Sequence, residues 1–450
     1  MNRISKKFGK KGNTVPLKQM NPMKTSKPNK FAWKKSPLAK RAAATPQHLS
    51  KINAHRKELL RCCAKLASCE DILAKFDVAI HATGLVGEHR NAKLIFLAVI
   101  TCMFERPVSI AVKGSSSGGK NTLASAVLSF FPPDAYCELT GMSDKALAYF
   151  SRPLKNRVLF ISELAGLSSG DGQVFLRNLL SEGFIKYEVT VGKGTRLVEI
   201  EGPTGLIITT TDIKLYHDDE TRLFSVEVSD TPQQNGKVFL SIGAQEETGV
   251  HVSRKPGPEW HALMQWIATM PLVVVNPYGG SIAKLLPVKA PPRLRRDVKA
   301  MFALVRAHAL LHQKNRKKQA DGAVIATLAD YKAVRALVKD IVAQGIDAGV
   351  AKGVRRTVEA VTKLLKKAPH VSAGQIAAKL NLHKGNVSRH TKAAIEDGYL
   401  RNLQESKGKT AQYVLGDPMP MDTDVLPSAT AVAKEYRNTM AEKVVAAGKA

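Results

Sequence analysis

The chain has 450 residues, a hydrophobic fraction of 44% and a formal net charge of +30. This length suffices for two or three domains with apolar cores, and the hydrophobic fraction excludes a wholly disordered chain. The sequence lacks an apolar run of the roughly 20 residues needed to cross a bilayer and an apolar stretch behind its first charges, so we expect no membrane span and no secretory signal. The charge favours a polyanionic partner, and we expect a cytoplasmic, nucleoid-associated protein that binds DNA.

Residues 1–47 form the first predicted segment, a basic arm. Residues 1–50 contain many lysines and no Asp or Glu, and they combine Pro, Gly, Ser and Asn without apolar periodicity. Such a composition predicts a disordered arm that attracts nucleic acid. A tail that only improves solubility is the alternative.

Residues 48–104 are predicted to be a helical N-terminal segment. Apolar residues recur there at helical spacing, and a turn at residues 84–88 separates two helices. Four of the five cysteines lie in this segment, and the fifth is Cys137. They show no C-x-x-C spacing and no matching histidine cluster, so we expect reduced thiols rather than disulfides or zinc ligands.

Residues 105–230 alternate between strand and helix patterns. A β-branched run at 108–113 leads through a glycine-rich loop to a helical stretch at 122–130, and an apolar run at 157–161 precedes another at 173–181. The alternation predicts an α/β core in which helices cover both faces of a parallel sheet. Further expected elements are strands at 136–139, 206–210 and 222–228, a helix at 144–150, and a β-hairpin at 185–201.

The remainder of the chain is predicted to hold a second and a third folded part. Residues 231–345 are interpreted as a linker and a helical lid, with helices at 293–314 and 328–344. Residues 357–416 form a compact unit with three helices and two short strands, and residues 417–450 are expected to be a tail with a loosely held helix.

The glycine-rich loop carries the strongest motif of the sequence. It spans Gly114 to Thr122 and has a G-x-x-x-x-G-K pattern between a strand and a helix. Phosphate binding needs backbone N–H groups that turn inward, a helix N-terminus and a lysine, so this is a predicted P-loop. A chance glycine-serine linker is the alternative. We expect ATP to be bound by Gly114, Ser117, Gly118, Gly119, Lys120, Asn121 and Thr122.

The expected magnesium site is atypical at two positions. A P-loop usually places Ser or Thr after the lysine and two acids at the end of a neighbouring strand. Here Asn121 follows Lys120, and the strand at 157–161 ends in Ser162 and Glu163. We expect Asn121 and Glu163 to hold Mg²⁺ and Glu163 to be the base, with slow hydrolysis as a consequence. An incidental glutamate at a strand end is the alternative.

Two more residues are candidates for catalysis, together with Lys120 and Glu163. Thr210, in a threonine run that ends a predicted strand, is expected to orient the attacking water. Arg222 precedes the next strand and is expected to reach the γ-phosphate of an adjacent subunit, where it would stabilise charge in the transition state. A surface arginine is the alternative.

The order of P-loop, acidic strand end, hairpin, polar strand end and arginine resembles that of AAA+ ATPases. A hairpin before the polar strand is similar to the clade of minichromosome maintenance and superfamily 3 viral helicases, including replication ATPases of phages and mobile elements. The resemblance implies a ring, expected to be a homo-hexamer, whose hairpin tip grips single-stranded DNA in the pore through Lys193 and Arg196. It also implies a sensor arginine in the lid, at Arg296, with Arg293 and Arg295 as competitors.

The unit at 357–416 is predicted to be a winged helix-turn-helix. Three helices followed by a short hairpin have this order, and Ser372 stands before the second helix as a cap. The third helix would enter the major groove of duplex DNA, and the wing would touch the backbone. The expected DNA contacts are Lys384, Asn386, Ser388, Arg389, His390, Lys392, Lys407 and Lys409. A winged helix used for protein contacts is the alternative.

Three functions are consistent with these patterns. The first is an ATP-dependent DNA helicase or replication-initiation ATPase. The second is a non-motor loader or matchmaker in which ATP controls assembly on DNA, and the third is a transcription regulator with a vestigial ATP site.

Overall fold

The computed structural model describes residues 46–141, 150, 152–162, 171–191, 194–211, 222–229, 231–249, 255–288, 290–349, 352–382, 384–404, 409–417 and 425–447. Nearly all of the expected arm, the expected helix at 144–150 and three predicted site residues, Glu163, Lys193 and Lys407, lie outside the described residues. In the described part of the chain, no helix is both long enough and apolar enough to cross a membrane.

Three helices precede the sheet: α2 (Pro46–Ala67), α3 (Ile72–His81) and α4 (His89–Thr101). Asp71 begins α3 by accepting a hydrogen bond from the backbone N–H of Ala74 at 2.8 Å. Every residue of α4 from Leu94 onward is buried, so this helix is enclosed rather than amphipathic. Phe76 of α3 stacks on Phe96 of α4 with ring centroids 4.2 Å apart. These three helices make up most of the segment at 48–104, and the turn at 84–88 lies between α3 and α4.

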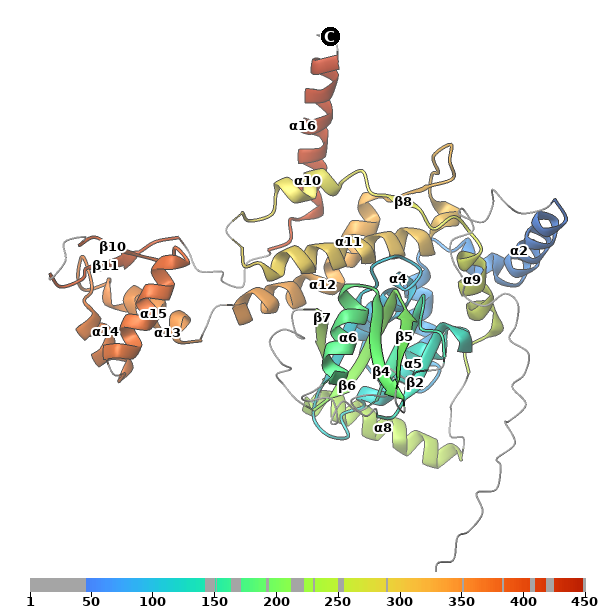
Figure 1. The fold of residues 1–450 in the computed structure, drawn as a ribbon, viewed down its shortest axis with the longest axis horizontal. Helices are drawn as coiled ribbons and strands as arrows, with labels where there is room; N and C mark the ends of the chain where they lie inside the picture. Colours follow the sequence, from blue (N-terminus) through green and yellow to red (C-terminus); the bar gives the residue numbers. More distant parts are fainter. Residues whose placement is uncertain are drawn as a thin grey trace, which may run out of the picture. The chain divides into compact units, whose positions relative to one another are not determined.

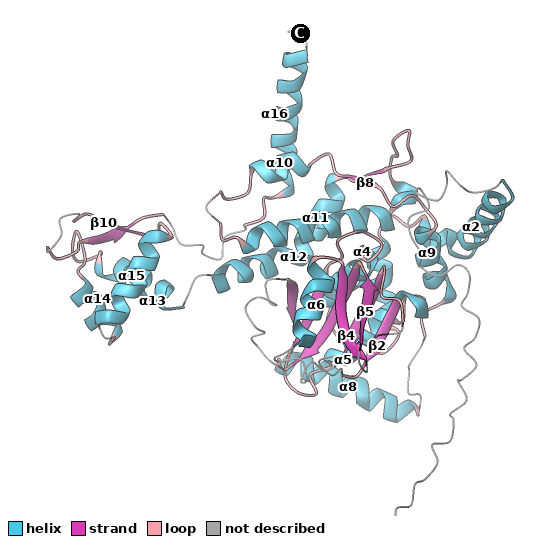
Figure 2. Cartoon of the chain, viewed as in Figure 1, coloured by secondary structure: helices cyan, strands magenta, loops and turns pink. Residues whose placement is uncertain are grey.

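A five-stranded sheet has the order β2-β3-β6-β1-β7, and every neighbouring pair is parallel. The strands are β1 (Ser109–Lys113), β2 (Tyr136–Leu139), β3 (Arg157–Ile161), β6 (Thr204–Thr210) and β7 (Leu223–Glu227). All residues of β1 and β6 are buried, as expected for inner strands covered on both faces. Figure 2 shows the strands surrounded by helices. The predicted α/β core with a parallel sheet is confirmed.

Alternate residues of the strands divide between two apolar clusters. On one face, Ile110 and Ile207 pack with α4 and with α5 (Lys120–Leu128). On the other face, Ala111 and Ile208 pack with α6 (Asp171–Ser181) and the hairpin. This division follows from the period of two along a strand. A short 3-10 helix, η1 (Pro133–Ala135), connects α5 to β2 through residues 129–132.

The hairpin consists of β4 (Phe184–Val191) and β5 (Gly194–Glu201), which pair antiparallel in a sheet of their own. It is inserted between α6 and β6, at the predicted place (Figure 1). Ile185 and Ile200 lie opposite each other and are buried against the sheet, which fixes the base of the hairpin.

The residues after β7 form mostly helices. They are α8 (Pro232–Thr248), α9 (Pro258–Ala268), α10 (Gly279–Lys284), α11 (Arg293–Leu311) and α12 (Leu328–Gly349), with the 3-10 helix η3 (Gln313–Asn315) and the short parallel pair β8 (Val274–Val275) and β9 (Val324–Ile325). The predicted lid helices correspond to α11 and α12. They share one apolar cluster with α2–α5, α9 and one face of the sheet, which we call the main core. The expected boundaries near 104 and 230 therefore do not separate independent cores.

The C-terminal unit has its own core. It comprises α13 (Lys352–Leu364), α14 (Ala373–Leu380), α15 (Lys384–Glu396) and the antiparallel strands β10 (Leu400–Asn402) and β11 (Tyr413–Leu415). Ser372 and Gln375 form a reciprocal capping box at the start of α14, as the position of Ser372 predicts. Asn381 ends this helix in the left-handed conformation, at φ 51°.

The last segment is not a loose tail as expected. Leu426 and Val432 are buried in the main core, and the Tyr331 hydroxyl of α12 donates a 2.7 Å hydrogen bond to the Pro427 carbonyl. Helix α16 (Ala429–Ala447) packs on α10, where the rings of Tyr278 and Tyr436 are 4.8 Å apart. Small alanines alternate with polar residues along this helix, and its few docking residues left no clear sequence pattern.

Candidate nucleotide site and DNA-binding domain

The glycines of the loop after β1 are required by its backbone. A Cβ at Gly114 would lie 2.3 Å from the Val228 side chain, and one at Gly118 would lie 3.0 Å from the Ser115 carbonyl oxygen. Gly119 has φ 80° and Ser117 has φ 63°, so both adopt the left-handed region. The loop is thus folded tightly between the ends of β1 and β7.

Lys120 is held over this loop. Its Nζ donates to the carbonyl oxygens of Gly114 at 3.1 Å and Ser115 at 2.5 Å. Lys120 is also the first residue of α5, whose N-terminus has no hydrogen bond from a capping side chain. A helix N-terminus with uncapped N–H groups beside an ammonium group is suited to an anion such as phosphate.

A side-chain network connects the start of α5 to the ends of β6 and β3. The Thr209 hydroxyl donates to Asn121 Oδ1 at 2.7 Å and also faces the Ser162 carbonyl oxygen at hydrogen-bond distance. The Ser162 hydroxyl lies 3.3 Å from the Leu139 carbonyl oxygen of β2. The atypical residues Asn121 and Ser162 therefore meet on either side of Thr209.

Thr209 was missed by the sequence analysis, which favoured its neighbour Thr210. Both are buried, but they belong to opposite faces of β6: Thr209 follows Ile207 on the face of α5, and Thr210 follows Ile208 on the face of α6. The alternation of side chains along the strand is the signal that distinguishes them. The role predicted for Thr210 remains a prediction.

Arg222 precedes β7 and lies at the N-terminal ends of the parallel strands, whereas the phosphate loop lies at their C-terminal ends. Leu223 pairs with Ser109 at the start of β1, four residues before Lys113, so Arg222 lies roughly 16 Å along the strands from the end of β1. Its Nε donates to the Ser181 hydroxyl of α6 at 2.9 Å. This position suits an arginine that acts on a nucleotide bound to another copy, and not on its own.

The arginines at the start of α11 differ in environment. Arg295 and Arg296 are exposed, whereas Arg293 packs against Gly345 of α12 and lies 3.7 Å from the buried carboxylate of Asp297. Burial raises the pKa of Asp297 to about 6, against the opposing effect of Arg293 and Arg296. Of the three competitors for a sensor, Arg293 is therefore the one that is partly buried in the lid beside Asp297.

The turn at 84–88 lies beside the phosphate loop. Glu88 Oε1 accepts a 2.7 Å hydrogen bond from the backbone N–H of Ser229, which follows Val228. Gln234 of α8 donates to the Val86 carbonyl oxygen at 2.7 Å. The segment between α3 and α4 is thereby fixed next to the end of β7, close to the phosphate loop.

Of the two hairpin residues expected to grip DNA, only Arg196 lies in the described part of the chain. Arg196 lies on β5 opposite Val189. Lys193, at the tip, is outside the described residues, so the proposed grip on DNA rests on the sequence alone.

Comparisons with known proteins concern mainly the C-terminal unit. Residues 357–401 match the family model of a winged helix-turn-helix DNA-binding domain. The C-terminal unit is a winged helix-turn-helix. No curated protein matches the chain. Among solved structures, a candidate ATPase from Cytophaga hutchinsonii ATCC 33406 is similar at 9% identity and a TM-score of 0.40, over 64% of this chain and 88% of that chain. This similarity is too low to carry an argument about function.

The winged helix presents part of the predicted DNA surface. Ser388, Arg389 and Lys392 are exposed on α15, and Lys409 is exposed before β11. Lys384 and Asn386 lie in the first turn of α15, but their side chains are outside the described part.

His390, expected among the DNA contacts, faces the other way. Its ring is half-buried against Gly353 of α13, where an added Cβ would come within 2.3 Å of Nε2. His390 is therefore a packing residue, because α15 turns this face toward the domain core.

Proposed function

We propose that the protein is an ATP-dependent DNA helicase or replication-initiation ATPase that acts as a ring, expected to be a homo-hexamer. The observation that carries the proposal is the opposite placement of the phosphate loop and Arg222 on one parallel sheet. Such an arrangement supports nucleotide sites that are completed by a neighbouring copy. ATP would be held by the loop around Lys120, with Mg²⁺ held by Asn121 and Glu163.

Helix α8 supports self-association. None of its residues is buried, and it exposes the apolar side chains of Phe239, Leu240 and Ile242 with relative exposures of 70%, 77% and 51%. Adjacent exposed apolar side chains are typical of interaction surfaces, and an isolated helix of this length gains little stability by itself. A second copy that covers α8 would account for both features.

The decisive experiment is ATP hydrolysis with and without DNA for the wild type, Lys120→Ala and Glu163→Gln. DNA-stimulated hydrolysis in the wild type, lost in both variants, is the expected result. A folded wild-type protein without affinity for adenine nucleotides would sink the proposal and leave only a DNA-binding regulator.

A second test separates a motor from a non-motor ATPase. The motor account predicts that Lys193→Ala abolishes unwinding of a forked duplex and retains ATP hydrolysis. Lys186→Ala is the matched control, because Lys186 lies on β4 of the same hairpin and pairs with Glu199 at 3.0 Å. It should unwind normally.

The loader or matchmaker is the second candidate, favoured by the network at Asn121. The carboxamide oxygen that would bind Mg²⁺ already accepts a hydrogen bond from Thr209, which supports weak hydrolysis. ATP-dependent assembly on DNA without strand separation would support this candidate over the motor.

A further inference from the structure

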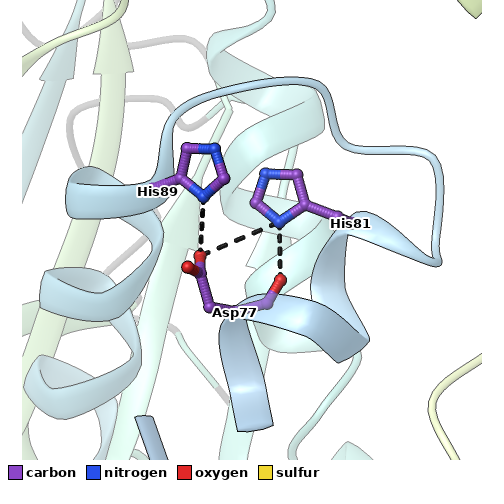
Figure 3. A group of neighbouring side chains, drawn as sticks. All are labelled: Asp77, His81 and His89. Atoms are coloured by element: carbon purple, nitrogen blue, oxygen red, sulfur yellow. Dashed lines mark hydrogen bonds and ion pairs between the residues drawn. The ribbon is translucent and has the colours of Figure 1, made fainter. Parts of the chain in front are cut away.

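Three metal-ligating side chains converge where α3 is followed by α4. Asp77 and His81 lie one turn apart on α3, and His89 is the first residue of α4 (Figure 3). His89 Nδ1 is 3.0 Å and His81 Nδ1 is 3.8 Å from Asp77 Oδ1, and the ligand atoms of the three residues all lie within 4.8 Å of one another. A tetrahedral ion with ligands at about 2.1 Å needs ligand atoms about 3.4 Å apart, a value between these two distances.

The surroundings orient His81 as a metal ligand is oriented. His81 Nε2 lies 3.0 Å from the Gly87 carbonyl oxygen, which can only accept, so Nε2 carries the proton. Nδ1 lies 2.5 Å from the Asp77 backbone carbonyl oxygen, which also can only accept, and 3.8 Å from the carboxylate. Without an ion these contacts need a hydrogen on Nδ1, and a metal cation would take the place of that hydrogen.

A hydrogen-bond partner also orients the Asp77 carboxylate. Lys93 Nζ lies 3.0 Å from Asp77 Oδ2, and it thereby leaves Oδ1 to face the two histidines. Backbone and ammonium partners behind the ligands are typical of metal sites.

A second histidine–aspartate cluster shows what a saturated arrangement looks like. Arg316 donates to both carboxylate oxygens of Asp330, and His308 Nδ1 lies 2.6 Å from Oδ1. His312 Nδ1 contacts the His308 carbonyl oxygen, and its Nε2 accepts from the backbone N–H of Ile72. Both carboxylate oxygens of Asp330 are bonded to a guanidinium, whereas Asp77 Oδ1 faces only the two histidines, so this second cluster is a structural core.

We propose that Asp77, His81 and His89 form a binding site for a divalent transition-metal cation, with Zn²⁺ as the best match to two imidazoles and one carboxylate. The ion would join α3 to α4 across the turn at 84–88. Because Glu88 of that turn accepts a hydrogen bond from Ser229 beside the phosphate loop, the ion would stabilise the segment next to that loop. The site does not depend on the proposed function.

The test uses the full chain, treated with a chelator and then titrated with Co²⁺ and Zn²⁺. The wild type should bind one ion per chain at this site and show the visible absorption of tetrahedral Co²⁺. His89→Ala should weaken binding by at least about tenfold, since even outer partners of a ligand contribute that much. His89 is 60% exposed, so the variant should fold. His370→Ala, which removes a histidine of the winged helix, is the control and should bind as the wild type does.

Thermal unfolding provides a second readout. Zn²⁺ should raise the Tm of the wild type and of His370→Ala but not that of His89→Ala. If His89→Ala folds poorly, His89→Gln, which retains size and polarity, takes its place. Equal Co²⁺ affinity in the wild type and the His89 variant, or no binding in the wild type, would overturn the proposal. The cluster would then be a protonated histidine pair on Asp77.

Discussion

Two residues at the candidate nucleotide site, Asn121 and Ser162, depart from the usual P-loop pattern, and hydrogen bonds connect them. Asn121 Oδ1 accepts from Thr209, whose hydroxyl is shared with the Ser162 carbonyl oxygen. A neutral amide oxygen with one lone pair already engaged is a weaker ligand for Mg²⁺ than a carboxylate, and it stands where a P-loop usually has a hydroxyl. In the proposed site, changes at Asn121 and at Ser162 would therefore affect the same Mg²⁺ ion, because Thr209 joins the two residues.

Asn121→Thr tests this account. It restores the usual hydroxyl beside Lys120, and we expect ATP hydrolysis at saturating Mg²⁺ to rise about tenfold, equivalent to ~1.4 kcal/mol in the barrier. Thr209→Val is the companion variant, because it frees the Asn121 oxygen without adding a ligand, and it should increase the rate less. A loss of hydrolysis in Asn121→Thr to the level of Lys120→Ala would contradict the account.

Asp297 provides a prediction about stability. Its pKa of about 6 in the folded chain exceeds the ordinary 3.8. The unfolding free energy is therefore larger below pH 4, where Asp297 is protonated, than above pH 6, where it is charged. Asp297→Asn removes the buried charge and should stabilise the protein by about 3 kcal/mol at pH 8 and by little at pH 4. Urea unfolding at the two pH values measures the difference. Asp340→Asn, at an exposed ion pair with Arg90, should change stability by less than about 1 kcal/mol.

At the scale of elements, the strands and the hairpin could be predicted because their signals are local. The inner strands β1 and β6 are continuous apolar runs bounded by glycine or threonine, and the hairpin has period two. What could not be predicted depends on distant packing. The burial of Leu426 and Val432 at the start of α16 and the inward face of α15 at His390 are defined by partners far along the chain. Thr209 was within reach, because only the alternation along β6 separates it from Thr210.

The contact between α11 and α3 carries an acid-sensitive group. Burial, together with the neighbouring His308, lowers the pKa of His312 to about 4 from the ordinary 6.5. The unfolded chain therefore takes up a proton first as the pH falls, and the stability contributed by neutral His312 is lost between about pH 6.5 and 4. Protonation of Asp297 in the folded chain acts in the opposite direction over nearly the same range, so the two effects largely cancel in the wild type.

The Asp297→Asn background should reveal the histidine. There, we expect acidification from pH 7 to pH 5 to reduce the unfolding free energy by about 2 kcal/mol. His312→Gln in the same background should remove most of this dependence, although it is less stable throughout because the bond to the Ile72 N–H is altered. An unchanged slope in the double variant would assign the dependence to another group.

In the sequence, the DNA-binding domain lies between two segments that both pack in the main core. Helix α12 packs in the main core before the winged helix, and Leu426 and Val432 return to the same core after it. A domain attached at both ends samples less space than one at a free terminus, which raises its effective concentration near the rest of the chain. If the protein is the proposed ring-forming ATPase, DNA held by Arg389 and Lys392 would remain close to the ring.

The proposed ring makes a prediction that a monomeric site does not. Lys120→Ala and Arg222→Ala should each lose most ATP hydrolysis alone, because every site lacks either the lysine or the arginine. When the two variants are mixed, some contacts combine the intact loop of an Arg222→Ala copy with the intact arginine of a Lys120→Ala copy, and hydrolysis should return in part. The measurement is the rate as a function of the mixing ratio, with a maximum expected near equal amounts. Arg222 lies at the opposite end of the strands from the phosphate loop of its own copy, so such complementation can arise only between copies. A rate that stays at the level of the separate variants at every ratio, in a mixture shown to form joint oligomers, would contradict the shared site.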